Sequence, residues 1–340
     1  SSFFKSLQGG RGTAAPDCPK REAPRAGERT AAQGRESAIP KTQCPQTRSL
    51  TSRRKRTRIK QIRVLLLSPP LLKHKITGMI PLQGPLPVET EETMNQYDNE
   101  KFFEQYSHMA RSERGLAGAG EWHELERMLP DFAGKDVLDL GCGFGWHCKY
   151  AAEHGARSVL GIDLSEKMLG EAKRRNPAQQ ITYRIGSIEG YEYPAERYDV
   201  VLSSLALHYV EDLSAVFEKI FRTLRPGGDF VFSIEHPIFT AQGPQDWIYG
   251  KDGSPLYWPV DHYFTEGERD AVFLGEHVRK YHHTLTTCLR GLLRAGFIIT
   301  DAAEPEPPEN MMDLPGMKDE LRRPMMLLIS AHSRPASAIF

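Results

Sequence analysis

The chain has 340 residues with 44 basic and 44 acidic side chains, which is long enough for one sizeable domain or two with a hydrophobic core. No apolar run approaches the length of a membrane span, so we predict no membrane insertion. Five scattered cysteines without a C-x-x-C pair argue against a disulfide framework or a zinc site and suit a reducing compartment. We therefore predict a cytoplasmic protein without a metal.

Residues 1–93 form a basic leader with 18 Lys and Arg against 7 Asp and Glu, whereas the rest holds 26 against 37. The leader lacks a sustained hydrophobic period, so we expect disorder. Its basic run at 53–60 is typical of a nuclear-import signal or a nucleic-acid patch, and its composition is similar to that of an organellar transit peptide. Because the first methionines are Met79 and Met94, we favour an extension that is not native.

From Met94 onward, helical and strand patterns alternate. We predict helices at 97–109 and 121–129, joined by a flexible glycine hinge at 115–120. Strands follow at 136–140, 158–162, 181–185, 198–203 and 229–234, with helices at 146–153, 165–175 and 211–224. Continuous apolar strands that alternate with helices indicate an α/β fold with a parallel sheet covered on both faces.

The alternation stops after the fifth strand. Residues 237–275 are loop-like and rich in aromatic side chains, which predicts an inserted segment. We consider two equal interpretations, a lid over a substrate with an apolar part and a flap packed for stability. A helix at 284–295 and strands at 297–300 and 325–330 complete the pattern.

A glycine-rich turn follows the first strand, with Asp139 in the strand and Gly141, Gly143 and Gly145 after it. Glycines let backbone N–H groups approach a ligand closely. A dinucleotide fingerprint requires a third glycine where Trp146 stands, and no G-K-[ST] triplet of a P-loop follows. Asp163 ends the second strand about 20 residues later, where a carboxylate can accept hydrogen bonds from ribose hydroxyls. The pattern favours a nucleoside without phosphates.

These segments resemble the class I S-adenosylmethionine-dependent methyltransferases of the small-molecule type. The likeness spans 97–333 and includes the family's first motif at 137–145, its second at 161–165, an adenine-contacting segment at 186–189, the fourth motif at 198–209 and a turn at 224–228. The resemblance implies a Rossmann-like, doubly wound, seven-stranded sheet whose last strand is antiparallel. It places the methyltransferase domain at 94–335.

The resemblance also implies S-adenosylmethionine as the cofactor. Backbone groups of the glycine loop would hold its methionine portion, Asp139 would organise the loop or meet the amino group, and Asp163 would bind the ribose. The cofactor-binding residues implied in this way are Asp139, Gly141, Cys142, Gly143, Gly145, Asp163, Leu164, Ser187, Ile188 and Tyr106. Ser187 stands where the family commonly has Asp, and its hydroxyl binds the adenine amino group more weakly.

Aromatic side chains of the first helix offer a second contact with the cofactor. Tyr106, with Tyr97 or Phe102, could close over the sulfonium, because aromatic faces attract cations. Ordinary packing of an amphipathic helix explains these residues equally well.

Two histidines are candidate catalytic bases. His208 follows the fourth strand and His236 the fifth, at the carboxyl ends where parallel sheets build their sites. Either could deprotonate a hydroxyl, although for each of them we favour the alternative of a loop histidine that caps or packs.

The sequence therefore predicts a methyltransferase that acts on an oxygen or nitrogen of a small-molecule acceptor. The acidic body opposes a nucleic-acid substrate, and Asn-Pro-Pro-Tyr is absent after the fourth strand. The alternatives are a non-catalytic scaffold with the cofactor fold, methylation of a macromolecule, and a dinucleotide oxidoreductase, which Trp146 opposes. No oligomeric state follows from the sequence.

Overall fold

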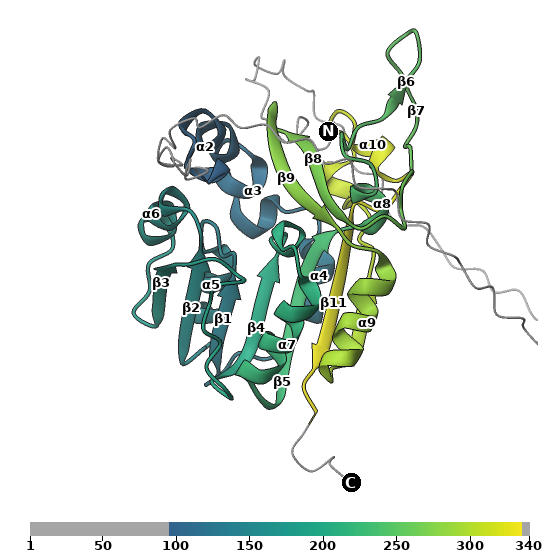
Figure 1. Cartoon of the computed structure of the whole chain (residues 1–340). Helices are drawn as coiled ribbons and strands as arrows, with labels where there is room; N and C mark the ends of the chain where they lie inside the picture. The colour runs from purple at the N-terminus through teal and green to yellow at the C-terminus, as the bar shows by residue number, and fades with distance from the viewer. Residues whose placement is uncertain (1–94, 335–340) are drawn as a thin grey trace, which may run out of the picture. The chain divides into compact units, whose positions relative to one another are not determined.

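The computed structural model describes residues 95–334, and the predicted strands pair there into one sheet (Figure 1). Its strands are β1 (Asp136–Leu140), β2 (Ser158–Asp163), β3 (Ile181–Ile185), β4 (Tyr198–Ser204), β5 (Leu224–Glu235), β10 (Ile298–Ala303) and β11 (Met326–His332), in the order β10-β11-β5-β4-β1-β2-β3. Strands β1 to β5 are parallel, and β11 runs antiparallel to both β5 and β10. The predicted seven-stranded sheet with an antiparallel last strand is confirmed.

The predicted leader, its disorder and its targeting signals lie outside the described residues. Within residues 95–334, no helix is long and apolar enough to cross a membrane.

Helices cover both faces of the sheet. One face packs against α4 (Trp122–Met128), α5 (Trp146–Glu153) and α6 (Glu166–Arg175), and the other against α7 (Leu213–Thr223) and α9 (Leu285–Ala295).

The alternation of side chains along β1 explains why one strand serves two cores. Val137 joins the cluster that contains Ala151 of α5, whereas Leu138 joins the cluster that contains Phe217 of α7 and Leu292 of α9. Every residue of β1 is buried, as expected for a central parallel strand.

The N-terminal helix is interrupted, contrary to the prediction of one helix at 97–109. A 3-10 turn, η1 (Gln96–Asp98), precedes α2 (Glu100–Ser107), and α3 (Ala110–Glu113) follows. Asn99 causes the break, because its side chain accepts a hydrogen bond from the Phe102 amide and so begins a new helix.

The predicted glycine hinge is also wrong. Gly115–Gly118 form a 3-10 turn, η2, and a Cβ added at Gly118 would lie 2.1 Å from the Ala110 carbonyl oxygen. The glycine permits close packing of two backbone segments there.

The inserted segment contains more regular structure than its sequence indicates. It begins with α8 (Pro237–Thr240), continues through a small hairpin of β6 (Ile248–Tyr249) and β7 (Pro255–Tyr257), and ends in β8 (Gly267–Phe273). β8 pairs with β9 (Glu276–His282) in an antiparallel hairpin above the carboxyl ends of the main sheet (Figure 1). The prediction missed this hairpin because a lysine, Lys280, stands at one of its buried positions. η3 (Leu207–Tyr209), η4 (Glu309–Met311) and α10 (Met317–Glu320) are the remaining helical turns of the described chain.

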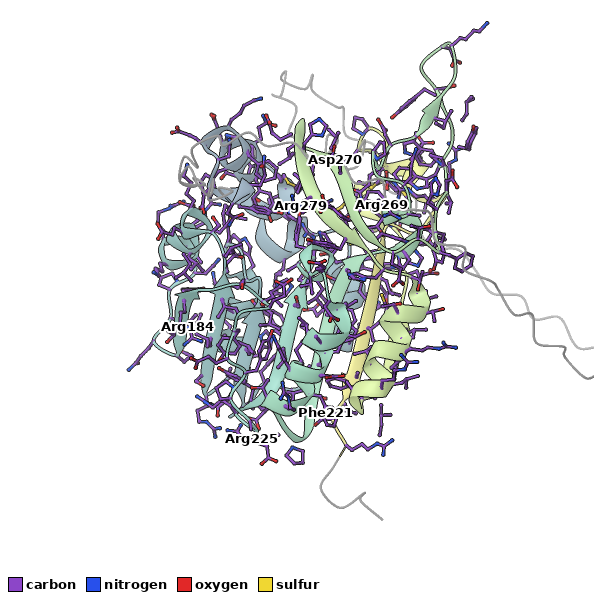
Figure 2. All side chains as sticks on the ribbon, viewed as in Figure 1. Arg184, Phe221, Arg225, Arg269, Asp270 and Arg279 are labelled. Carbon is purple, nitrogen blue, oxygen red and sulfur yellow. The ribbon has the colours of Figure 1, made fainter. Side chains whose placement is uncertain are left out.

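A buried carboxylate holds the opposite, amino-terminal edge of the sheet together. Asp136 at the start of β1 accepts hydrogen bonds from Arg157 at 2.6 and 3.0 Å, from Ser158 at 2.6 Å, from Arg197 at 2.8 Å and from Arg225 at 3.0 Å. Arg157, followed by Ser158 and Arg225, holds the pKa of this carboxyl well below its usual range, against the effect of burial. Figure 2 shows Arg225 at this edge, far along the sheet from Arg279 of the β8–β9 hairpin.

We expect Asp136→Asn to lower the free energy of unfolding at pH 7 by about 1–3 kcal/mol, because charged hydrogen bonds are lost. Since the folded-state pKa is depressed, this contribution is present above the unfolded pKa of about 4 and disappears as the pH falls below it. Urea unfolding at pH 7 and pH 3 measures the difference. Equal stability of the two proteins at pH 7 would contradict the role of Asp136.

Candidate functional site

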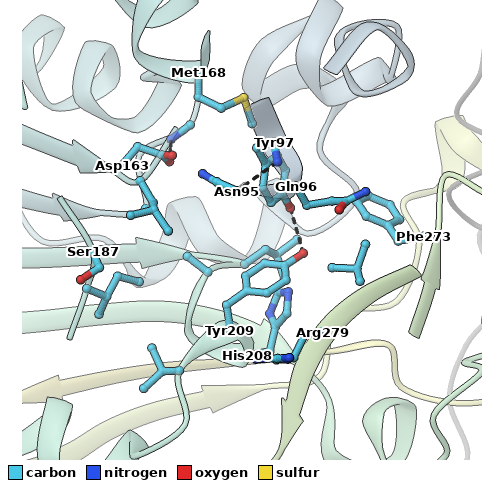
Figure 3. Close-up of a pocket in the computed structure, with 18 of the residues that line it drawn as sticks. Asn95, Gln96, Tyr97, Asp163, Met168, Ser187, His208, Tyr209, Phe273 and Arg279 are labelled. Atoms are coloured by element: carbon cyan, nitrogen blue, oxygen red, sulfur yellow. Dashed lines mark hydrogen bonds between the residues drawn. The ribbon is translucent and has the colours of Figure 1, made fainter. Parts of the chain in front are cut away.

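A cavity of about 560 Å³ lies at the carboxyl ends of β1, β2, β4 and β5 (Figure 3). One end is bordered by Gly141, Gly143, Asp163, Leu164, Met168, Ser187 and Ile188, and the other by His208, Tyr209, Glu235, Phe273, Val278 and Arg279. Tyr97, Tyr106 and Arg111 border it from the N-terminal segment. This is the edge at which parallel α/β sheets bind their ligands.

The glycine loop reaches the cavity in a conformation that requires glycine. Gly141, Gly143 and Gly145 have φ angles of +72°, +53° and +75°. A Cβ at Gly141 would lie 2.4 Å from the Ala206 Cβ, and one at Gly145 would lie 2.2 Å from the Tyr183 hydroxyl. The loop therefore presents bare backbone to the cavity while it packs against β3 and the segment that follows β4.

Asp163 is hydrogen-bonded to the glycine loop. One carboxylate oxygen, Oδ2, accepts from the Gly143 amide at 2.9 Å, and the other, Oδ1, accepts from the Ser165 amide at 2.9 Å. Burial raises the pKa of this carboxyl, and the two amides act in the opposite direction. Each oxygen keeps a lone pair with which it can accept a hydrogen bond from a ligand hydroxyl.

Comparison with known proteins identifies the family. Residues 138–232 match the model of a methyltransferase domain. The chain is 56% identical to a Listeria monocytogenes protein of known structure that is assigned to the S-adenosylmethionine-dependent methyltransferases, and the match covers 65% of this chain and 99% of that one, with a TM-score of 0.62. This chain belongs to the S-adenosylmethionine-dependent methyltransferases.

Two further relatives align with about two thirds of this methyltransferase. An S-adenosylmethionine-dependent methyltransferase from Mesorhizobium loti is 45% identical over 64% of this chain and 100% of its own length, with a TM-score of 0.59. An uncharacterized protein of Haemophilus influenzae is 32% identical over 244 residues, which is 69% of this chain and 95% of the relative. The predicted enzyme class and the predicted cofactor, S-adenosylmethionine, are confirmed.

The methyltransferase brings most of the predicted site residues together. Gly141, Gly143, Asp163, Leu164, Ser187, Ile188, Tyr106 and His208 border the main cavity, and Cys142 borders a smaller cavity next to it. Asp139, Gly145 and His236 border neither. The contact with the cavity that was expected of these three residues is therefore not observed.

Asp139 lies beneath the loop. It is 1% exposed, and its Oδ2 accepts a hydrogen bond from the Cys148 thiol at 3.2 Å. Its Oδ1 has no hydrogen-bond partner within residues 95–334. Burial raises the pKa of this carboxyl to about 7. Of the two predicted roles, contact with the loop interior agrees with this position better than contact with a ligand.

His236 has the capping role that was left open for it. Its Nδ1 accepts a hydrogen bond from the Ile238 amide at 3.0 Å at the start of α8, and its Nε2 lies 2.8 Å from a carboxylate oxygen of Glu304. The ring is buried away from the cavity and is no longer a candidate base.

His208 borders the cavity beside a buried charged cluster. Its Nε2 lies 3.9 Å from Oε1 of Glu235, and its Nδ1 is buried without a hydrogen-bond partner in the described chain. Glu235 accepts hydrogen bonds from Lys280 at 2.6 Å and from Gln245 at 2.8 Å. Burial lowers the pKa of His208 to about 4, so its imidazole is neutral at pH 7.

Sequence reasoning missed several of these residues. Glu235 ends the fifth strand directly before His236, so the rule that selected His236 could have found it. Lys280 gave no signal, because its strand was not predicted. Arg111 is partly buried, borders both cavities and pairs with Glu121, but it lies between the predicted helix at 97–109 and the predicted hinge at 115–120.

The predicted aromatic lid does not face the cavity. Phe239, Trp247 and Trp258 surround the guanidinium of Arg323 at 4.7, 5.4 and 4.1 Å from their ring centroids. These contacts agree with the packed-flap interpretation of the insertion better than with the lid interpretation. Phe273, at the end of β8, is the aromatic side chain of the insertion that borders the cavity.

We expect Asp139→Asn to change how stability depends on pH. Between the unfolded pKa of about 4 and the folded pKa of about 7, the folded wild-type protein binds a proton that the unfolded chain lacks, so its stability falls as the pH rises. The variant should avoid this loss and gain up to about 1.4 kcal/mol per pH unit relative to wild type. Urea unfolding at pH 5, 6 and 7 measures the gain, with exposed Asp313→Asn as control. Parallel pH curves would refute the raised pKa.

Proposed function

We propose that this methyltransferase transfers its methyl group to an oxygen or nitrogen of a small organic acceptor. The observation that carries the proposal is the lining of the far end of the cavity, where His208, Glu235 and Val278 are buried side chains from η3, β5 and the β8–β9 hairpin. The whole cavity, including the part near the glycine loop, measures about 560 Å³. Sites of this size take small molecules. The net negative charge of residues 94–340 further disfavours a nucleic-acid acceptor.

The residues at the near end of the cavity, beside the glycine loop and Asp163, fit S-adenosylmethionine. In our proposal, Gly141 and Gly143 offer backbone N–H and C=O groups to the methionine portion, and Asp163 accepts hydrogen bonds from the ribose hydroxyls. Leu164, Ser187 and Ile188 frame the adenine. The partly buried guanidinium of Arg111 supplies a positive charge for the cofactor carboxylate.

Tyrosine rings border the part of the cavity between its two ends. The hydroxyls of Tyr97 and Tyr209 are 2.8 Å apart (Figure 3). The Tyr97 ring packs edge-on against Tyr106, with the ring centroids 5.4 Å apart. We propose that these rings line the region of the sulfonium, because aromatic faces attract cations.

The bound cofactor supplies an electrophilic methyl group, so the protein chiefly aligns the acceptor with it. Proximity and orientation supply roughly 7–11 kcal/mol in ideal cases. A hydroxyl acceptor must also lose a proton, and His208 and Glu235 are two polar groups that border the far end of the cavity.

Asp163→Ala should weaken the binding of S-adenosylmethionine by about 1–3 kcal/mol, because charged hydrogen bonds to the ribose and to the Gly143 amide are lost. Isothermal titration measures the affinity. Asp261→Asn, in an exposed loop outside the cavity, is the control. An affinity equal to that of wild type would remove Asp163 from the site.

Incubation of the protein with methyl-labelled S-adenosylmethionine and cell extract should place the label in the low-mass fraction. His208→Asn should lower the rate of labelling at least about tenfold with cofactor affinity unchanged, since it removes a group that contacts the acceptor. His262→Asn, whose ring is 76% exposed, is the matched control.

Two results would contradict the proposal. Label confined to protein or nucleic acid would refute a small acceptor. An unaltered rate in His208→Asn would separate this residue from the chemistry.

A further inference from the structure

Two polar groups at the far end of the cavity lie close together without a hydrogen bond between them. Nε2 of His208 and Oε1 of Glu235 are 3.9 Å apart, which is beyond hydrogen-bond distance. Both residues border the cavity. One oxygen atom placed between them can hydrogen-bond to both. The spacing therefore suits a ligand group that accepts one hydrogen bond and donates another, as a hydroxyl does.

Glu235 is held as an anion by groups behind the cavity wall. Lys280 donates to Oε1 at 2.6 Å and Gln245 donates to Oε2 at 2.8 Å, and neither of these two residues borders the cavity. Burial by itself would raise the pKa of Glu235, but Lys280 and then His208 bring it below its usual value. The carboxylate is therefore charged and held in a fixed position beside the cavity, and its remaining lone pairs can accept hydrogen bonds.

His208 is poised to donate rather than accept. The negative charge of Glu235 near Nε2 favours a proton on that nitrogen. The other nitrogen, Nδ1, is buried without a partner in the described chain, and an unpartnered N–H is the costlier arrangement. In the resulting tautomer, the lone pair is on Nδ1 and the N–H of Nε2 points to the gap.

We infer that Glu235, rather than His208, takes the proton of the acceptor, and that the acceptor group is a hydroxyl held by the N–H of His208. This inference rests on the proposed function and assigns the chemistry of its acceptor end. As the bond from the hydroxyl oxygen to the methyl carbon forms, the carbon–sulfur bond breaks and its electron pair stays on sulfur. The oxygen becomes electron-poor, its proton becomes strongly acidic, and Glu235 accepts it to become a neutral carboxylic acid. The products are a methyl ether and S-adenosylhomocysteine.

The tautomer of His208 is a direct test that needs no acceptor. We expect the nitrogen chemical shifts of ¹⁵N-labelled full-length protein, saturated with S-adenosylhomocysteine at pH 7, to show the proton of His208 on Nε2. The signal is assigned by its disappearance in His208→Asn. A proton on Nδ1 would overturn the inference, because Nε2 would then be the base.

Labelling with methyl-labelled S-adenosylmethionine and cell extract tests the chemistry. Glu235→Gln should lower the rate at least about 100-fold with unchanged cofactor affinity, and the wild-type product should carry a new O-methyl group. Glu235→Gln with Lys280→Met removes both buried charges, guards against misfolding and should be equally inactive. Glu268→Gln is the matched control and should keep full activity, because Glu268 lies on the hairpin that carries Lys280 but its side chain is 57% exposed.

The outcomes separate the two proposals. A wild-type rate in Glu235→Gln, or a product methylated on nitrogen, overturns this inference and leaves the small-molecule methyltransferase standing. A wild-type protein that labels no small molecule refutes the proposed function itself, and the inference falls with it.

Discussion

The cavity depends on the carboxylate of Asp163. Its two oxygens accept hydrogen bonds from amides of the glycine loop and of Ser165. The Ser165 hydroxyl donates to Asp98 at 2.6 Å and also caps α6 by accepting from the Met168 amide. One partly buried acidic group thus connects the end of β2, the glycine loop, a helix N-terminus and the N-terminal segment that carries Tyr97. These short hydrogen bonds hold the glycine loop and the segment of Tyr97 in place, and both border the main cavity.

Acidic side chains at the two ends of the strands make different kinds of contact. At the amino-terminal edge, Asp136 is fully engaged by arginine and serine side chains, and its charge stabilises the fold. At the carboxyl-terminal edge, Asp163 and Glu235 keep unused lone pairs beside a cavity, an arrangement that sacrifices stability for binding. Buried Asp139, with its raised pKa, shows that an acidic residue near the glycine loop can belong to the scaffold instead of the cavity.

The β8–β9 hairpin is joined to the sheet, beside the far end of the cavity, by an ion pair that lies near an aromatic ring. Lys280 is 2% exposed, bonds to Glu235 of β5 and lies 5.2 Å from the ring centroid of Phe273. A buried pair of this kind contributes little net stability compared with apolar packing, and losing one partner is costly. Its consequence is positional, because it ties the hairpin to the sheet at a single register and fixes a charged oxygen beside His208.

The sequence alone was sufficient for the sheet, the glycine turn and the carboxylate of Asp163. Apolar strands, capping residues and glycines at positive φ are local requirements, and each leaves a local pattern. Tertiary structure decided which polar residues meet. His208 and His236 occupy equivalent places after neighbouring strands, yet one borders the cavity and the other caps α8. Glu235 and Lys280 are 45 residues apart, and only strand pairing brings them together. Contacts between distant residues depend on the path of the whole chain, which no local pattern encodes.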